Sequence, residues 1–166
     1  MGNDILFFNP PQTKNGVCLQ NRALLWIASY LKKSGFSTRV FSLASTFKKI
    51  IRRALDYYRP KNVAVSCKWY TNLYGAILVA KEIRKINKEI KIITGGHTAA
   101  YFDKELLQSG YFDLVVRGDA EIPLLNILKN KTPINCTIKE NNQIKRYPLQ
   151  YTQEHEDLEN YTLSEP

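Results

Sequence analysis

Short apolar segments alternate along this chain with longer segments whose apolar residues recur at helical spacing. Most of the apolar segments are rich in valine, isoleucine or phenylalanine, and turn-forming residues follow them. Strands that are apolar throughout are typical of parallel sheets covered by helices on both faces. The predicted strands are residues 4–8, 38–43, 63–67, 90–94 and 112–116.

Five amphipathic segments separate or follow these strands. Gly110 comes directly after one of them and Gly35 two residues after the end of another, as helix-ending residues do. Crossovers between parallel strands are right-handed, so the alternation predicts an α/β fold of the flavodoxin-like or Rossmann-like type. We expect a doubly wound five-stranded parallel sheet in the strand order 2-1-3-4-5. The predicted helices are residues 19–33, 46–58, 72–87, 102–109 and 121–128.

The C-terminal part of the chain has a different pattern. Residues 135–139 and 143–147 flank a turn-forming segment and predict a β-hairpin, whereas residues 151–166 are polar and acidic. We therefore expect an α/β domain at 1–130, a hairpin extension at 131–150 and an acidic linker or tail at 151–166.

The composition excludes several classes of protein. Hydrophobic residues make up 44% of the chain and charged residues 23%, which is ordinary for a globular domain and excludes a largely disordered one. No apolar run is long enough to cross a membrane, and the N-terminus lacks the basic region of a signal peptide. Cys18, Cys67 and Cys136 are too widely spaced for a zinc or iron–sulfur site or a disulfide scaffold. We expect mostly buried thiols in a cytoplasmic protein.

The net charge of +9 raises the alternative of nucleic-acid binding. Residues 151–166 hold five acidic side chains and no Lys or Arg, which leaves ten acidic against 24 basic residues in 1–150. Basic clusters on the predicted helices 46–58 and 72–87 are able to follow phosphates. They lie on the outer faces of amphipathic helices, where solvated charge is ordinary, so a soluble surface or a docking face is our preferred interpretation.

Candidate ligand-binding residues lie where the predicted strands end, because open parallel sheets bind ligands outside the carboxyl ends of their strands. These loops hold two prolines, two adjacent aromatic residues, two glycines before a histidine, and an arginine before Gly-Asp-Ala-Glu. The aromatic residues have an alternative role as core or interface packing residues, and Asp119 has one as a helix N-cap. The candidates are Asn9, Pro10, Pro11, Ser66, Cys67, Lys68, Trp69, Tyr70, Gly95, Gly96, His97, Thr98, Arg117, Gly118, Asp119 and Glu121.

The sequence lacks the common nucleotide and catalytic motifs. It has no GxGxxG after the first strand, no P-loop and no GxSxG elbow. Asn9 and Ser66 stand where a receiver domain would need acidic residues, and the first loop lacks a flavin phosphate cradle, although Trp69 and Tyr70 leave flavin stacking open. We therefore expect no catalytic residue in this chain, and these motifs assign no metal-ligating residue.

Five segments, taken in order over roughly residues 4–129, resemble the cobalamin-binding domain that precedes the catalytic barrel in many radical S-adenosylmethionine enzymes. The segments are DILFFNPP, LLWIASYLKKSGF, VAVSCKWYTN, IKIITGGHTAAYF and DLVVRGDAEIPLLNIL. The family usually has Gly-Glu-Gly-Glu where this chain has Gly118-Asp119-Ala120-Glu121.

The resemblance implies that cobalamin lies across the carboxyl ends of the strands. Ser66 and the segment 95–98 would line the pocket of its nucleotide tail, while segments 9–11 and 68–70 would contact the corrin. The segment 117–121 would border the tail or its phosphate. Related mutases carry a cobalt-ligating histidine in Asp-x-His-x-x-Gly after the first strand, and this chain has none there. We therefore expect no histidine ligand to cobalt, with His97 facing the nucleotide and His155 solvated. The lower face of cobalt would hold water, no ligand, or a side chain such as Lys68, Trp69 or Tyr70.

The resemblance also implies a larger enzyme, of methyltransferase type or another radical catalyst. The Cys-x-x-x-Cys-x-x-Cys motif of its 4Fe–4S cluster is absent from this sequence, so the cluster and S-adenosylmethionine would belong to a separate barrel. That barrel would follow residue 166 in cis, or act in trans where the chain is complete. This chain alone would then bind cobalamin without catalysis. The alternative is a domain that keeps the fold but serves as an interaction module without a cofactor.

Overall fold

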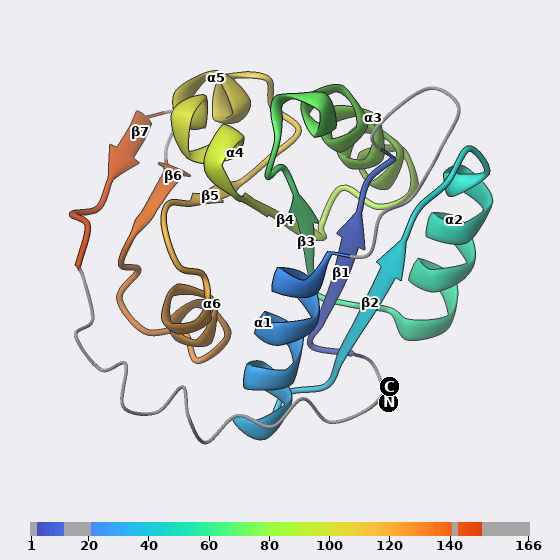
Figure 1. Ribbon diagram of the computed structural model, residues 1–166, viewed down its shortest axis with the longest axis horizontal. Helices are drawn as coiled ribbons and strands as arrows, with labels where there is room; N and C mark the ends of the chain where they lie inside the picture. Colours follow the sequence, from blue (N-terminus) through green and yellow to red (C-terminus); the bar gives the residue numbers. More distant parts are fainter. Residues whose placement is uncertain (1–2, 12–20, 141–142, 151–166) are drawn as a thin grey trace.

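A computed structural model describes residues 3–11, 21–140 and 143–150. Its strands form one seven-stranded sheet in the order β2-β1-β3-β4-β5-β6-β7, in which the first five strands run parallel (Figure 1). The predicted α/β class and the order 2-1-3-4-5 are confirmed. The strands are β1 (Ile5–Asn9), β2 (Thr38–Ser42), β3 (Asn62–Ser66), β4 (Lys91–Gly95), β5 (Leu114–Val116), β6 (Cys136–Glu140) and β7 (Gln143–Arg146).

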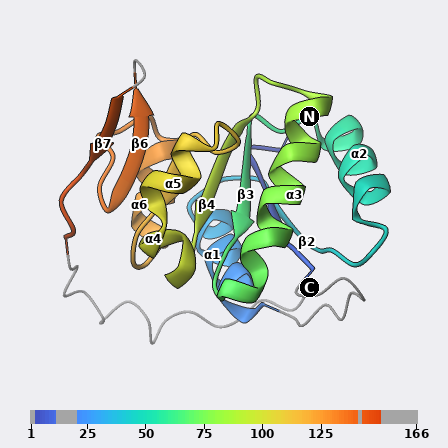
Figure 2. The ribbon, with the colours of Figure 1, turned by 90° about the horizontal axis from the view of Figure 1, so that it is seen from above.

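Helices cover both faces of the sheet, as Figures 1 and 2 show. The first and last helices pack on one face and the other four on the opposite face. None of the helices among the described residues is long and apolar enough to cross a membrane. The helices are α1 (Arg22–Lys33), α2 (Phe47–Tyr58), α3 (Tyr70–Ile86), α4 (His97–Tyr101), α5 (Asp103–Gln108) and α6 (Glu121–Leu128).

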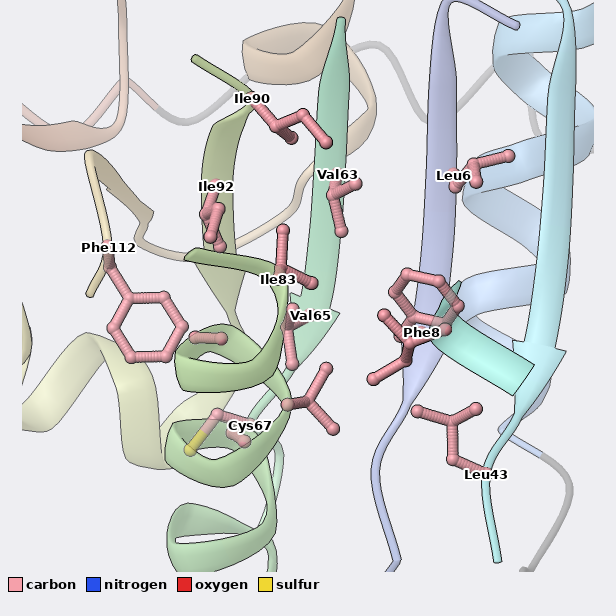
Figure 3. Close-up of a cluster of buried hydrophobic side chains, with 14 of the residues drawn as sticks. Leu6, Phe8, Leu43, Val63, Val65, Cys67, Ile83, Ile90, Ile92 and Phe112 are labelled. Atoms are coloured by element: carbon pink, nitrogen blue, oxygen red, sulfur yellow. The ribbon is translucent and has the colours of Figure 1, made fainter. Parts of the chain in front are cut away.

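Strand β1 is buried on both of its faces. Leu6 and Phe8 pack in the cluster beneath α2 and α3 (Figure 3), while Ile5 and Phe7 pack against α1 on the other face. All four side chains are fully buried, and each contributes about 1.5–3 kcal/mol by leaving water. This two-sided burial explains why the strand reads as a continuous apolar run.

The predicted C-terminal hairpin is present, and it extends the sheet. Strand β6 pairs antiparallel with β5, with Val115 opposite Thr137, and β7 pairs antiparallel with β6. Its turn residues 141–142 and the predicted linker 151–166, with His155, lie outside the described residues, as do Cys18 and residues 19–20 of the first predicted helix.

The predicted helix at 102–109 begins too late and is in fact two helices. Helix α4 starts at His97, directly after Gly96, and α5 follows it after a break at Phe102. The early start has a physical reason, because backbone carbonyls of the loop after β3 accept hydrogen bonds from the N–H groups of Thr98 and Ala99. These N–H groups have no partner within the helix itself.

Candidate functional site

A cavity of about 320 Å³ opens at the carboxyl ends of β3, β4 and β5, beside the first turns of α1, α4 and α6. Both apolar side chains and polar or charged groups line it. The apolar side chains include Phe7, Leu24, Ile27, Ala64, Ile93, Val116 and Leu124, and the polar lining includes Asn21, Ser66, Lys68, Thr94, His97, Asp119 and Glu121.

Asn21 connects two walls of this cavity. Its side-chain oxygen accepts a hydrogen bond from the backbone N–H of Leu24 at 3.4 Å, as an N-cap of α1 does. Its Nδ2 donates to the Oγ of Ser66, at the end of β3, at 3.0 Å. The start of α1 is therefore fixed to the end of β3 at the cavity.

Gly96 lies where the loops after β3 and β4 meet. Its φ is +112°, and a Cβ there would lie 2.7 Å from Cα of Lys68 and 2.8 Å from the carbonyl oxygen of Cys67. The Lys68 carbonyl accepts hydrogen bonds from both the N–H and the Oγ1 of Thr98, each at 3.2 Å. The glycine is therefore required by chain packing, and the N–H groups that begin α4 are already bonded.

Exposed aromatic side chains lie next to the cavity, at the start of α3. Trp69 is 54% exposed and Tyr70 79%, so the alternative that they fill the core is wrong. The Trp69 ring lies 6.3 Å from the His97 ring, and Nζ of Lys68 lies 5.4 Å from the Trp69 ring centre. A large flat ligand placed over the strand ends would find aromatic surface here.

Residues 13–128 match the family model of the B12 binding domain, which is more than half of the chain. The chain belongs to the B12-binding domain family.

This B12-binding domain is 31% identical, over 111 residues, to hopanoid C-3 methylase of Methylococcus capsulatus. The match covers 66% of this chain and 22% of that protein. The chain therefore spans about a fifth of that relative.

Two solved structures share the fold of this B12-binding domain. One is the radical S-adenosylmethionine methyltransferase TsrM from Kitasatospora setae with cobalamin and a 4Fe–4S cluster bound, at a TM-score of 0.77 and 16% identity. The other is the cobalamin-dependent S-adenosylmethionine radical enzyme OxsB with aqua-cobalamin bound, at a TM-score of 0.72 and 14% identity. The first match covers 93% of this chain and 30% of TsrM, and the second covers 91% and 23% of OxsB.

The B12-binding domain brings half of the sequence-predicted candidates to the cavity wall. The segment 117–121 contributes its last four residues, and the loops after β3 and β4 contribute the others. The predicted candidates that line the cavity are Ser66, Lys68, Gly95, Gly96, His97, Gly118, Asp119 and Glu121.

Other candidates lie elsewhere. Asn9 and Pro10 are buried, and the carbonyl oxygen of Pro11 lies against Gly75 of α3, so this segment packs on a helix. The rest of that loop, residues 12–20, lies outside the described residues. Cys67 is fully buried, and burial raises the pKa of its thiol to about 12.

Arg117 is directed toward the hairpin. Its guanidinium donates hydrogen bonds to the backbone carbonyls of Cys136, at 3.3 Å, and Tyr147, and its side chain does not line the cavity. Burial, followed by the charge of Arg146, lowers the pKa of Arg117 below its usual value. The sequence placed this arginine in the correct loop but gave no sign of its direction.

Two acidic side chains lie at the wall formed by residues 118–121. Asp119 is not the N-cap of α6, because that position is Ala120 and the helix has no side-chain cap, so the interpretation of Asp119 as a cap is wrong. Burial, and to a lesser degree the Asp119 charge, raise the pKa of Glu121, while its backbone hydrogen bonds oppose this.

Metal ligands are not gathered in the described part of the chain. No group of three or more His, Cys, Asp or Glu side chains there is able to hold a metal ion. The main residue that sequence reasoning missed is Asn21, although an asparagine before an amphipathic run is a recognisable N-cap signal.

Proposed function

We propose that this chain binds cobalamin across the carboxyl ends of its strands, with the nucleotide tail in the cavity described above. One observation carries the proposal beyond family membership: the cavity of about 320 Å³ combines apolar walls with a few convergent polar groups. This mixture is typical of sites for large organic ligands. The ligands named for TsrM and OxsB support the same proposal.

The residues present fit such a ligand in two groups. Ser66, Gly95, Gly96 and His97 would line the tail with Asn21, and Gly118, Asp119 and Glu121 would border it on the other side. The exposed Trp69 and Tyr70 would contact the corrin together with the half-buried Lys68. Asn9, Pro10, Pro11, Cys67, Thr98 and Arg117 would act by holding these loops in place.

We propose that no histidine of this chain coordinates cobalt. His97 lines the cavity next to Trp69, and residues 9–20 contain no histidine. Bound cobalamin would supply a cobalt centre suited to methyl transfer, and the chain's own part is to bind and orient it.

We propose further that the chain is the cobalamin-binding part of a larger radical S-adenosylmethionine enzyme of methyltransferase type. The likeness to hopanoid C-3 methylase and TsrM supports this. A catalytic barrel carrying the 4Fe–4S cluster and S-adenosylmethionine would act in cis after residues 151–166, or in trans. Residues 1–130 would form the binding domain and 131–150 its extension, with no catalysis by this chain alone.

Titration of the purified chain with hydroxocobalamin tests the binding proposal. We expect the cofactor to stay with the protein through gel filtration and to shift its visible bands, without the spectrum of an imidazole nitrogen on cobalt. A spectrum with an imidazole nitrogen on cobalt would contradict the proposal that no histidine of this chain coordinates cobalt. No retention and no spectral change at near-millimolar ligand would instead favour an interaction module without a cofactor.

A further inference from the structure

A buried carboxylate connects the hairpin to the rest of the domain. Asp103, the first residue of α5, is only 3% exposed. Its Oδ2 accepts hydrogen bonds from Oγ1 of Thr137 in β6 and, at 2.8 Å, from Nε of Arg146 in β7. Nε of Arg117, which follows β5, lies 3.8 Å away from the same oxygen. One carboxylate therefore faces two guanidinium groups and a hydroxyl from three strands or strand ends.

Arg117 extends this network to the cavity wall. Its backbone N–H donates to the carbonyl of Asn135 at 2.7 Å, and its guanidinium bonds the carbonyls of Cys136 and Tyr147. Gly118, the next residue, has a φ of +81° and begins the wall that continues to Glu121. Gly118 brings no side chain to hold the start of the wall, and the residue before it, Arg117, is bonded to the hairpin.

Asp103 is also joined to a second wall. It follows α4 after a single residue, and His97 and Ala100 of α4 line the cavity. Without the carboxylate, Arg117 and Arg146 would face each other with no opposing charge, in a place where Arg117 is 11% exposed. Loss of one partner from a buried charge network is strongly destabilising locally.

We propose that Asp103 is a positioning residue that couples the β6–β7 hairpin to the cavity, so that seating of the hairpin orders the wall formed by residues 118–121. The inference rests on the proposed binding of cobalamin only for its functional consequence. Because such coupling is reciprocal, bound cofactor would in turn stabilise the seated hairpin. Whatever holds the hairpin in its seated position would therefore also set the affinity of the cavity.

The test compares Asp103→Asn with the matched control Asp113→Asn in the full chain. Asp113 pairs with Arg84 and accepts a hydrogen bond from the N–H of Ile92 at 2.7 Å, and it does not line the cavity. In Asp103→Asn without ligand, we expect faster amide hydrogen exchange in residues 118–121 and in the hairpin. We also expect hydroxocobalamin to bind about tenfold more weakly, as ordering of a loose wall would require. Asp113→Asn should change neither.

Arg146→Gln is the second variant, for use if Asp103→Asn does not fold. Because the Arg146 side chain is half-exposed, its loss should destabilise the fold less. Arg146→Gln should also speed amide hydrogen exchange in residues 118–121 and in the hairpin. Unchanged exchange at 118–121 in the folded variants would overturn the proposal whether or not cobalamin binds. Equal loss of affinity in Asp103→Asn and Asp113→Asn would also overturn it, since that indicates general destabilisation. Faster exchange at 118–121 in a chain whose wild type binds no cobalamin would leave the coupling standing and reject the proposed ligand.

Discussion

At the scale of single residues, Gly96 meets two steric requirements at once. Its φ of +112° disfavours any side chain, and a Cβ would collide with the backbone of Cys67 and Lys68. Gly35 has a φ of +91° and open space around it, so it carries the first requirement without the second.

We predict that Gly96→Ala lowers the free energy of unfolding by about 3 kcal/mol, the sum of a left-handed backbone and backbone overpacking. Gly35→Ala should lower it by about 1–2 kcal/mol, because only the backbone conformation is unfavourable. Urea denaturation at pH 7 measures both. Equal losses in the two variants would show that the close approach of the two loops does not matter.

The two buried thiols of the described residues give a pH prediction. Burial raises the pKa of Cys67 and Cys136 to about 12. Their thiols should therefore resist iodoacetamide at pH 8 in the native chain and react after unfolding, as site-resolved mass spectrometry would show. Rapid native labelling of Cys67 would contradict its burial.

The raised pKa of these thiols also makes the free energy of unfolding depend on pH. The folded state keeps these protons while unfolded thiols lose them above their usual pKa of about 8.5. Stability from this source is thus complete below about pH 8.5 and falls as pH rises toward 12. Cys67→Ala should show a shallower fall than the wild type in urea unfolding between pH 8 and 10. An equal fall of the free energy of unfolding with pH in the two proteins would exclude a contribution from the Cys67 thiol.

The sequence located the correct loops better than it located side-chain directions. Ser66, Gly96 and His97 were predicted at the site because parallel strands bring their carboxyl ends together. Arg117 was predicted in the correct loop, yet its guanidinium bonds hairpin carbonyls that follow it by some 20–30 residues in sequence. A tertiary contact of this kind leaves no local pattern to read.

At the scale of elements, the site depends on how α1 is attached to β3. The Asn21 side chain caps the helix and also donates to Ser66. A shorter side chain that still caps helices, such as serine, would keep the first contact and lose the second.

We predict that Asn21→Ala lowers the free energy of unfolding by about 1 kcal/mol through loss of the cap, whereas Asn21→Ser keeps most of that stability. Both variants should bind hydroxocobalamin more weakly than the wild type, since neither reaches Ser66. Urea denaturation and spectral titration separate the two effects. Wild-type affinity in Asn21→Ser would show that the bond to Ser66 has no part in binding.

Helix and strand alternation was sufficient to predict the order of the first five strands. It did not predict that β6 pairs with β5, because nothing in residues 135–139 specifies a partner strand. The start of α4 at His97 was missed for a similar reason, since carbonyls of a distant loop bond its first N–H groups.

At the scale of the whole molecule, the excess positive charge lies away from the cavity. Lys48, Lys49, Arg52 and Arg53 of α2 are exposed, as are Lys81, Lys85 and Lys88 in and after α3, and none of them lines the cavity. The arrangement agrees with a solvated outer surface on the helices that cover one face of the sheet.

We predict that Lys48→Glu combined with Lys49→Glu leaves hydroxocobalamin affinity within about twofold of the wild type. These two charges do not line the cavity, and exposed charges are screened at physiological salt. Spectral titration at constant ionic strength measures the effect. A loss of tenfold or more would show that the basic surface of α2 takes part in binding.

A comparison of cobalamin with cobinamide, which lacks the nucleotide tail, tests most directly whether the cavity at the strand ends holds that tail. Equilibrium dialysis of the chain against each corrinoid gives the two dissociation constants. We expect cobalamin to bind at least about tenfold more tightly than cobinamide, because only cobalamin has the tail that fills the cavity. Equal affinities, or failure to retain either corrinoid at near-millimolar concentration, would contradict it.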